Sequence, residues 1–186
     1  MSLFSMNHSK AAYRADFAIY GVTVLALLTY LFLIGQYGRW LEFVVLVVVG
    51  LASWTLIEYA IHRFVMHGLQ PFSRWHAQHH QRPVALICTP TIMSMLLIVT
   101  LIFLPALIVS SNLWRACALT LGVVVGYLFY SVTHHATHHW RADSDWLKQR
   151  KRWHALHHKN IEQPACFGVT SGFWDYVFRS THHRKS

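Results

Sequence analysis

The stretch HRFVMH at residues 62–67, followed by HAQHH at residues 76–80, places five histidines within nineteen residues. A second group, HHATHH, occupies residues 134–139. A third, HALHH, occupies residues 154–158 and repeats the spacing HxxHH. Long apolar segments separate the three groups, and we expect the rest of the chain to bring these histidines together.

The apolar residues are concentrated in uncharged runs rather than spread along amphipathic faces. They make up 54% of the 186 residues, whereas charged residues make up only 12%. A helix rises about 1.5 Å per residue and a bilayer core is about 30 Å thick, so runs of this length predict membrane-spanning helices. The predicted spans are residues 17–35, 41–61, 84–104 and 113–133. The first is expected to be an uncleaved anchor helix, because no small-residue cleavage site follows it.

The order of spans and motifs predicts a topology. Four spans in two hairpins would leave all three histidine groups on one side of the bilayer. Basic residues agree, because most of them share that side: Lys10, Arg14, Arg63, Arg74, Arg82 and the basic tail, with Arg39 and Arg115 opposite. By the positive-inside rule the histidine side is cytoplasmic. This rule also accounts for the net charge of +9, and no DNA- or RNA-binding motif is present.

We therefore predict an all-α integral membrane fold. Four transmembrane helices in two hairpins would carry a cytosolic, histidine-rich helical cap made of residues 62–83 and 134–186. By length, residues 1–186 are expected to form a single membrane-embedded domain.

Helical periodicity predicts which histidines share a face. Residues i, i+3 and i+4 lie on one side of a helix, so each HxxHH motif presents its three imidazoles together. His134 and His138 form an i, i+4 pair, while His135 and His139 form another pair turned by about 100°. His62 and His67 are five residues apart and diverge on a straight helix. They can converge only if the span ends or bends there.

Three histidine groups with these spacings indicate a polynuclear metal site. Neutral imidazole binds zinc, copper, iron and nickel. Eight to ten candidate ligands exceed the needs of one ion, so we expect two. Structural zinc sites usually include cysteine, whereas Cys88, Cys117 and Cys166 are isolated here. Redox-active iron is the favoured interpretation, although the spacings alone leave zinc and copper open.

These residues resemble a known family. The pattern Glu58-Tyr59-x-x-His62-Arg63-x-x-x-His67, followed by HxxHH, HxxxH and HxxHH, is similar to that of the integral-membrane fatty acid hydroxylase/sterol desaturase superfamily. The tail FGVTSGFWDYVF at residues 167–178 resembles the ending of the fatty acid 2-hydroxylase branch. The resemblance covers roughly residues 40–180. It implies a di-iron, O₂-dependent lipid hydroxylase or desaturase with its metals at the cytosolic membrane surface.

Carried over position by position, the resemblance implies ten metal ligands: His62, His67, His76, His79, His80, His134, His138, His154, His157 and His158. His135 and His139 would be neighbours of the ligands or alternatives to them, with His135 able to replace His134. The gap between His67 and His76 is closer to that of bacterial carotenoid hydroxylases, which leaves the substrate open. Residues 1–186 contain no haem, flavin or iron–sulfur motif, so electrons are expected from a separate cytochrome-b-type protein or a ferredoxin with its reductase.

Three further polar residues are candidates for supporting roles in catalysis. Glu58 is four residues before His62 and could accept an imidazole N–H and so orient the ring; the alternative is an interfacial acid. Asp175 could do the same for the third histidine group, or begin a helix, or pair with Arg179. Asn160 could hydrogen-bond a ligand or water, or cap a helix.

The function expected from these observations is a membrane-bound di-iron hydroxylase of lipid biosynthesis. It would use O₂ to insert oxygen into a C–H bond of a fatty acyl or related lipid chain, in a bacterial inner membrane or the endoplasmic reticulum. The alternatives are a carotenoid-ring hydroxylase or a sterol or lipid desaturase. From another class, a histidine-rich metal transporter or store is less favoured, because transporters place ligands near the bilayer midplane and these spans have no histidine there.

Overall fold

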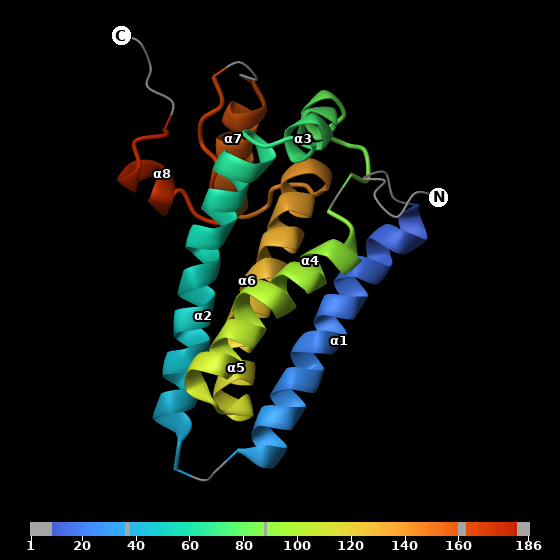
Figure 1. The fold of residues 1–186 in the computed structure, drawn as a ribbon. Coiled ribbons are helices and arrows are strands. Elements are labelled where there is room, and N and C mark those ends of the chain that lie inside the picture. Colours follow the sequence, from blue (N-terminus) through green and yellow to red (C-terminus); the bar gives the residue numbers. More distant parts are fainter. Residues whose placement is uncertain (1–8, 36–37, 88, 160–162, 182–186) are drawn as a thin grey trace. The chain divides into compact units, whose positions relative to one another are not determined.

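The elements that the structure describes are all helices, which confirms the expected all-α class (Figure 1). The structure is a computed structural model that describes residues 9–35, 38–87, 89–159 and 163–181. In chain order the elements are α1 (Lys10–Ile34), α2 (Trp40–Ala60), the π-helix η1 (Ile61–Met66), α3 (Phe72–Gln81), α4 (Thr91–Ile98), the π-helix η2 (Val99–Phe103), α5 (Leu104–Ser110), α6 (Leu113–His139), α7 (Asp145–Lys159) and α8 (Phe173–Val177).

Four helical stretches are long and apolar enough to cross a bilayer, as the sequence predicts. They are Lys10–Ile34, Trp40–Met66, Thr91–Ser110 and Leu113–His139. The second and fourth continue past their predicted ends because the first histidines extend the same helices. The third begins later than the predicted residue 84. Pro83 and Pro90 disfavour helical backbone in the residues before them, and α4 begins directly after Pro90.

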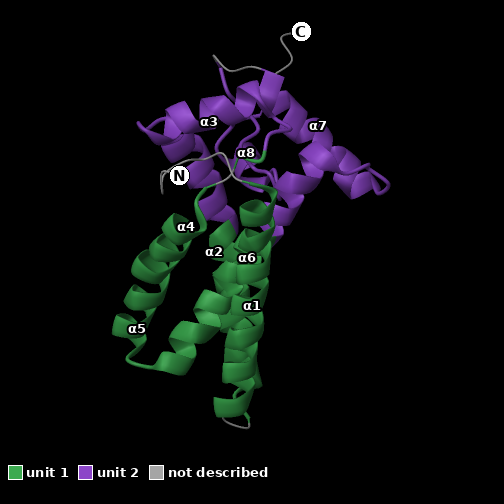
Figure 2. Ribbon diagram, turned by 90° about the vertical axis from the view of Figure 1, so that its right-hand side faces the viewer, with its two compact units in different colours: residues 1–54, 86–128 green, residues 55–85, 129–186 purple. Residues whose placement is uncertain are grey.

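The chain divides into two compact units (Figure 2). Unit 1 comprises residues 1–54 and 86–128, and unit 2 comprises residues 55–85 and 129–186. The boundaries fall inside α2 and inside α6. All ten predicted metal ligands belong to unit 2. The expectation that residues 1–186 form a single domain stays a prediction.

Helix α6 is the most enclosed of the four candidate spans. In its most apolar stretch 61% of the residues are buried, compared with 11% in each of the other three. Around it a core cluster in unit 1 contains Leu31 of α1 with Cys117, Ala118 and Leu121 of α6. The other spans expose rows of Val, Leu and Ile. Such apolar exposure suits helices whose outer faces contact lipid.

Helices α2 and α6 approach closely in unit 1 at a pair of glycines. A Cβ atom at Gly50 would overlap the carbonyl oxygen of Leu119, and one at Gly122 would overlap that of Val47. The same added Cβ atoms would lie 3.1 Å and 3.0 Å from the Cα of the opposite glycine. Small residues allow the backbones of membrane helices to pack at this short range.

Polar side chains connect three helices within unit 1. The Tyr20 hydroxyl of α1 donates to Ser94 Oγ of α4 at 2.7 Å, and Tyr127 of α6 lies beside Tyr20 with ring centroids 4.4 Å apart. Thr91 Oγ1 donates to Asp16 Oδ1 at 2.6 Å. Because unpaired polar groups are costly in an apolar environment, these bonds fix how α1 packs on α4.

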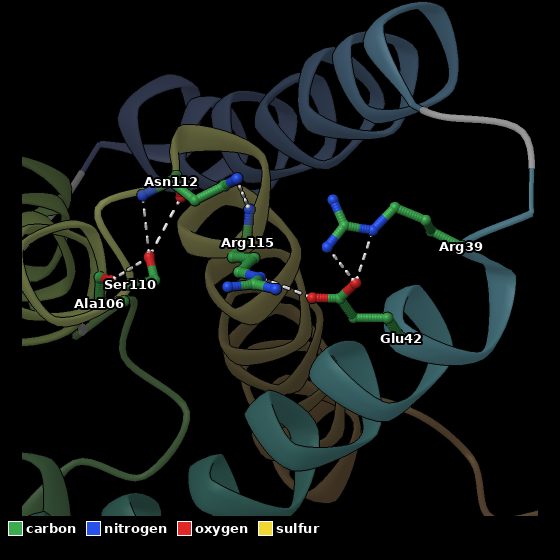
Figure 3. Close-up of polar contacts among 6 residues, drawn as sticks. All are labelled: Arg39, Glu42, Ala106, Ser110, Asn112 and Arg115. Carbon is green, nitrogen blue, oxygen red and sulfur yellow. Dashed lines mark hydrogen bonds and ion pairs between the residues drawn. The ribbon is translucent and has the colours of Figure 1, made fainter.

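Glu42 bridges two arginines at the N-terminal ends of α2 and α6 (Figure 3). Arg39 Nε donates to Glu42 Oε2 at 2.8 Å, and Arg115 Nε donates to Glu42 Oε1 at 2.6 Å. Asn112 caps α6 by accepting from the backbone N–H of Arg115. Arg39 and Arg115 are the two arginines that the sequence places on the side without histidines. One carboxylate offsets part of their positive charge, so the net positive charge on that side is reduced.

Replacing Gly122 with alanine should destabilise unit 1. The added methyl group must push α2 away from α6, and overpacking of this kind typically costs about 1–3 kcal/mol. Thermal unfolding of the purified protein in detergent would show a lower midpoint. Gly21→Ala is the matched control, because nothing lies within 4 Å of a Cβ there and alanine favours the helix. Equal effects of the two substitutions would contradict the close crossing.

Candidate metal centre

Ten histidines converge in unit 2 as two groups of five. Group one comprises His62, His67, His76, His80 and His157. Group two comprises His79, His134, His138, His154 and His158. Within each group the potential ligand atoms all lie within 4.8 Å of one another. These are the ten positions that the sequence singles out, although their role as ligands stays a prediction.

Each of the two HxxHH motifs contributes histidines to both groups. From α3, His76 and His80 enter group one while His79 enters group two. From α7 the distribution is reversed, because His154 and His158 enter group two and His157 enters group one. The i, i+4 pair of each motif therefore faces one group and its middle histidine faces the other.

A π-helical turn brings His62 and His67, which are five residues apart, to the same side of the helix. On an α-helix five residues turn the chain through about 500°, which leaves the two side chains roughly 140° apart. Residues 61–66 instead form the π-helix η1, whose hydrogen bonds join residues i and i+5. The His62 and His67 rings lie 5.4 Å apart between centroids. The expected bend at the end of the second span is thus a change of helix type.

The ring nitrogens meet at distances that suit a shared metal ion. Six pairs of Nε2 atoms lie between 2.8 and 3.1 Å apart: His62–His76, His76–His80 and His67–His157 in group one, and His79–His134, His138–His154 and His154–His158 in group two. Two imidazoles bound at about 2.0–2.1 Å and at right angles would lie about 2.8–3.0 Å apart, whereas a tetrahedral angle would give about 3.3–3.4 Å. Five imidazoles at this spacing fit an ion with more than four ligands.

Burial keeps these imidazoles neutral and ready to bind a metal. It lowers the pKa of His67 and of His80 to about 4, and with the help of neighbouring imidazoles it lowers that of His158 to about 3. Burial also holds the pKa of His76 and His154 well below the usual range. At pH 7 all five therefore offer a lone pair instead of a positive charge.

Glu58 does not contact an imidazole, and the expectation that it accepts a histidine N–H is wrong. Its Oε1 accepts from the backbone N–H groups of Val169 and Thr170 at 2.7 and 2.9 Å. Its Oε2 accepts from the Thr170 hydroxyl at 2.5 Å. The side chain is buried, and both of its oxygens accept hydrogen bonds from residues 169 and 170.

Asp175 likewise binds the same loop rather than a histidine of the third motif or Arg179. It is fully buried and accepts from the backbone N–H groups of Phe167 and Gly168, both at 2.8 Å. Ser180 Oγ also donates to it at 2.8 Å.

The remaining candidates lie outside the two groups. Asn160 is not among the described residues. The His135 and His139 rings stack on each other, with centroids 4.5 Å apart, and neither joins a group. His134, not His135, belongs to group two, because His134 and His138 are four residues apart on α6 and lie on the same face of that helix.

Sequence reasoning misses two backbone carbonyls that touch the site. His62 Nδ1 lies 2.5 Å from Phe167 O, and His157 Nδ1 lies 2.8 Å from Ala165 O. A carbonyl oxygen only accepts, so Nδ1 carries the proton in both rings and Nε2 is left for a metal. No residue pattern could reveal these contacts, since every residue has a carbonyl group.

Comparisons with known proteins agree with this fold. The fatty acid hydroxylase family model matches residues 47–180. The dihydroceramide fatty acyl 2-hydroxylases FAH2 and FAH1 of Arabidopsis thaliana are 33% and 35% identical, over 72% and 74% of this chain and 59% and 60% of theirs. A solved structure of full-length scs7p, in which only the hydroxylase domain is visible, matches with a TM-score of 0.78 at 25% identity and covers 94% of this chain and 68% of that one.

The chain belongs to the fatty acid hydroxylase family, which confirms the resemblance drawn from its histidine motifs. With four apolar helices of sufficient length it is a multi-pass membrane protein. It spans about 60% of the length of the Arabidopsis relatives.

Single substitutions should separate the two groups by metal content. His76→Ala and His79→Ala each remove an imidazole from one group only, so each should reduce the bound metal from about two ions per chain to about one. Elemental analysis of the purified protein measures this number. His139→Ala is the control and should keep both ions. Loss of both ions in either single variant would contradict two separate groups.

Proposed function

We propose that this chain is a di-iron, O₂-dependent lipid hydroxylase that inserts oxygen into a C–H bond of a fatty acyl chain. The observation that carries the proposal is the pair of all-histidine groups in a member of the fatty acid hydroxylase family. The names of the Arabidopsis relatives indicate C2 of an acyl chain bound to a sphingoid base as the position of attack. That substrate is the one we propose here.

The protein's own residues would hold and shield the metals. Ten imidazoles, five to a group, would bind two ions through Nε2. The ring of Phe167 lies 5.4–5.9 Å from those of His62, His67 and His157 and covers group one with an apolar surface. His157 is fully buried and His62 nearly so, which keeps bulk water from these ligands. Bound iron would supply the activation of O₂ needed to break an unactivated C–H bond.

The overall reaction needs an external source of electrons. Hydroxylation converts R–H, O₂, two electrons and two protons into R–OH and water. The described residues offer no cysteine cluster for an iron–sulfur centre, so we propose that a separate cytochrome-b-type protein or a ferredoxin with its reductase supplies both electrons. Lys148 and Arg152, which are exposed on α7, would suit an acidic donor.

The membrane orientation belongs to the same proposal. Lys and Arg residues outnumber acids near the histidine-bearing segments, which supports a cytoplasmic metal centre by the positive-inside rule. A reductant delivered from the cytoplasm would reach such a centre without crossing the bilayer. The membrane would be a bacterial inner membrane or the endoplasmic reticulum.

Expression in a host whose lipids lack hydroxylated acyl chains should test the activity. Under ¹⁸O₂, lipid mass spectrometry should show acyl chains that gain one labelled oxygen at C2. His157→Ala should abolish this product, whereas His8→Ala, outside the three motifs, should not. Loss of two hydrogens without label would indicate a desaturase, and labelled carotenoid rings would indicate the carotenoid alternative. Unlabelled lipids together with altered cellular metal content would overturn the proposal in favour of transport or storage.

A further inference from the structure

The loop of residues 165–170, here called the anchor loop, contacts group one through its backbone. Its Ala165 and Phe167 carbonyls accept from His157 and His62, as described above. Cys166, between them, has a φ of 58°, so the two carbonyls flank a left-handed residue. A side chain at Gly168 would overlap the carbonyl oxygen of Ser171. The loop therefore has a fixed conformation that aims two carbonyls at two imidazoles.

Two buried carboxylates hold the anchor loop in place. Asp175 accepts two of its amide N–H groups, and Glu58 accepts two more together with the Thr170 hydroxyl. The residues are 0% and 4% exposed. Five hydrogen bonds from the loop, four of them from its backbone, end on these two side chains. Each carboxylate thus ties the loop to a helix, Glu58 to α2 and Asp175 to α8.

Asp175 acts on His62 through a single peptide group. The N–H of the peptide between residues 167 and 168 donates to Asp175 Oδ2, and its C=O accepts from His62 Nδ1. Negative charge at one end of such a chain polarises the peptide and strengthens the bond at the other end. A stronger bond at Nδ1 makes Nε2 of His62 a better metal ligand. The matching peptide at Ala165 ends on a neutral group, since Cys166 N donates to Ser180 O at 2.8 Å.

Group two has no comparable support in the described part of the chain. The Nδ1 atom of His79 is buried without a hydrogen-bond partner, and the ring of His158 interacts with the backbone of His80 on α3 rather than with the anchor loop. The other hydrogen bonds of the group-two rings join Nε2 atoms to one another. His80 of group one also lacks a partner at Nδ1, so the contrast between the groups rests on His62 and His157.

We infer that the two groups hold their metal ions unequally, with the ion of group one anchored by the loop and the ion of group two released first. Asp175 and Glu58 are then positioning residues that act through the anchor loop. The inference rests on the proposed two-metal centre. Loss of such orienting contacts typically weakens metal binding about 10- to 100-fold, so release rates should differ by at least about tenfold.

The test follows metal release rather than turnover. The purified full chain, loaded with two Zn²⁺ ions, is mixed with excess chelator, and released zinc is measured over time. We expect two phases of equal size that differ at least about tenfold in rate. His79→Ala should remove the fast phase. Asp175→Asn, which keeps the shape but loses the charge, should accelerate the slow phase about tenfold and leave the fast phase unchanged.

A single phase for both ions, or equal acceleration of both phases by Asp175→Asn, would overturn the inference. If Asp175→Asn does not fold, Thr170→Val is the second variant, because it removes only the Thr170 hydroxyl that donates a hydrogen bond to Glu58. It should accelerate the slow phase alone by a few-fold, and an unchanged slow phase would count against the loop. Two intact phases in a protein that never oxygenates lipid would overturn the proposed function while leaving this inference in place.

Discussion

The structure of unit 2 depends on one constraint: ten imidazoles must direct their Nε2 atoms toward two points, with five imidazoles at each. Nitrogen atoms 2.8–3.1 Å apart in a buried setting are crowded unless protons or a metal ion lie between them. Low pKa values keep the histidines of the cap helices neutral at pH 7, so each of these rings carries a single N–H and has one nitrogen lone pair to offer a metal. The arrangement is that expected of two sets of metal ligands brought together by different helices.

Helices α3 and α7 link the two groups, because each helix contributes histidines to both. Each helix gives two imidazoles to one group and one to the other, so neither group is complete without both helices. The rings of His80 and His158, from different groups, stack with centroids 4.3 Å apart. Because ligands gathered from several elements make metal binding part of the folding free energy, metal loading would stabilise unit 2 as a whole.

Buried acids take a different part in the site from the one their sequence positions suggest. Neither Glu58 nor Asp175 touches a histidine, yet both hold the loop whose carbonyls do. A neutral imidazole shell leaves the charge of an ion unbalanced. Asp175, which is linked to His62 through one peptide group, lends negative charge to that ligand without occupying a coordination position.

The amino-acid sequence by itself determines the class of fold and the histidines that matter. Four spans follow from apolar runs, and the ten histidines follow from i, i+3 and i+4 spacings and their resemblance to a family, because both kinds of signal are local in the chain. Even the late start of the third span could have been found from Pro83 and Pro90.

Only the tertiary structure decides how those histidines are shared. Helical periodicity places His76, His79 and His80 on one face, but the position of a second helix assigns His79 to the other group. It also reveals the π-turn at η1 and the targets of Glu58 and Asp175. The physical reason is that Glu58 binds backbone groups more than a hundred residues away, and that η1 is a change of helix type. Asp175 binds backbone N–H groups only seven and eight residues away, but nearly every residue carries such a group, so residue identity does not reveal the partner.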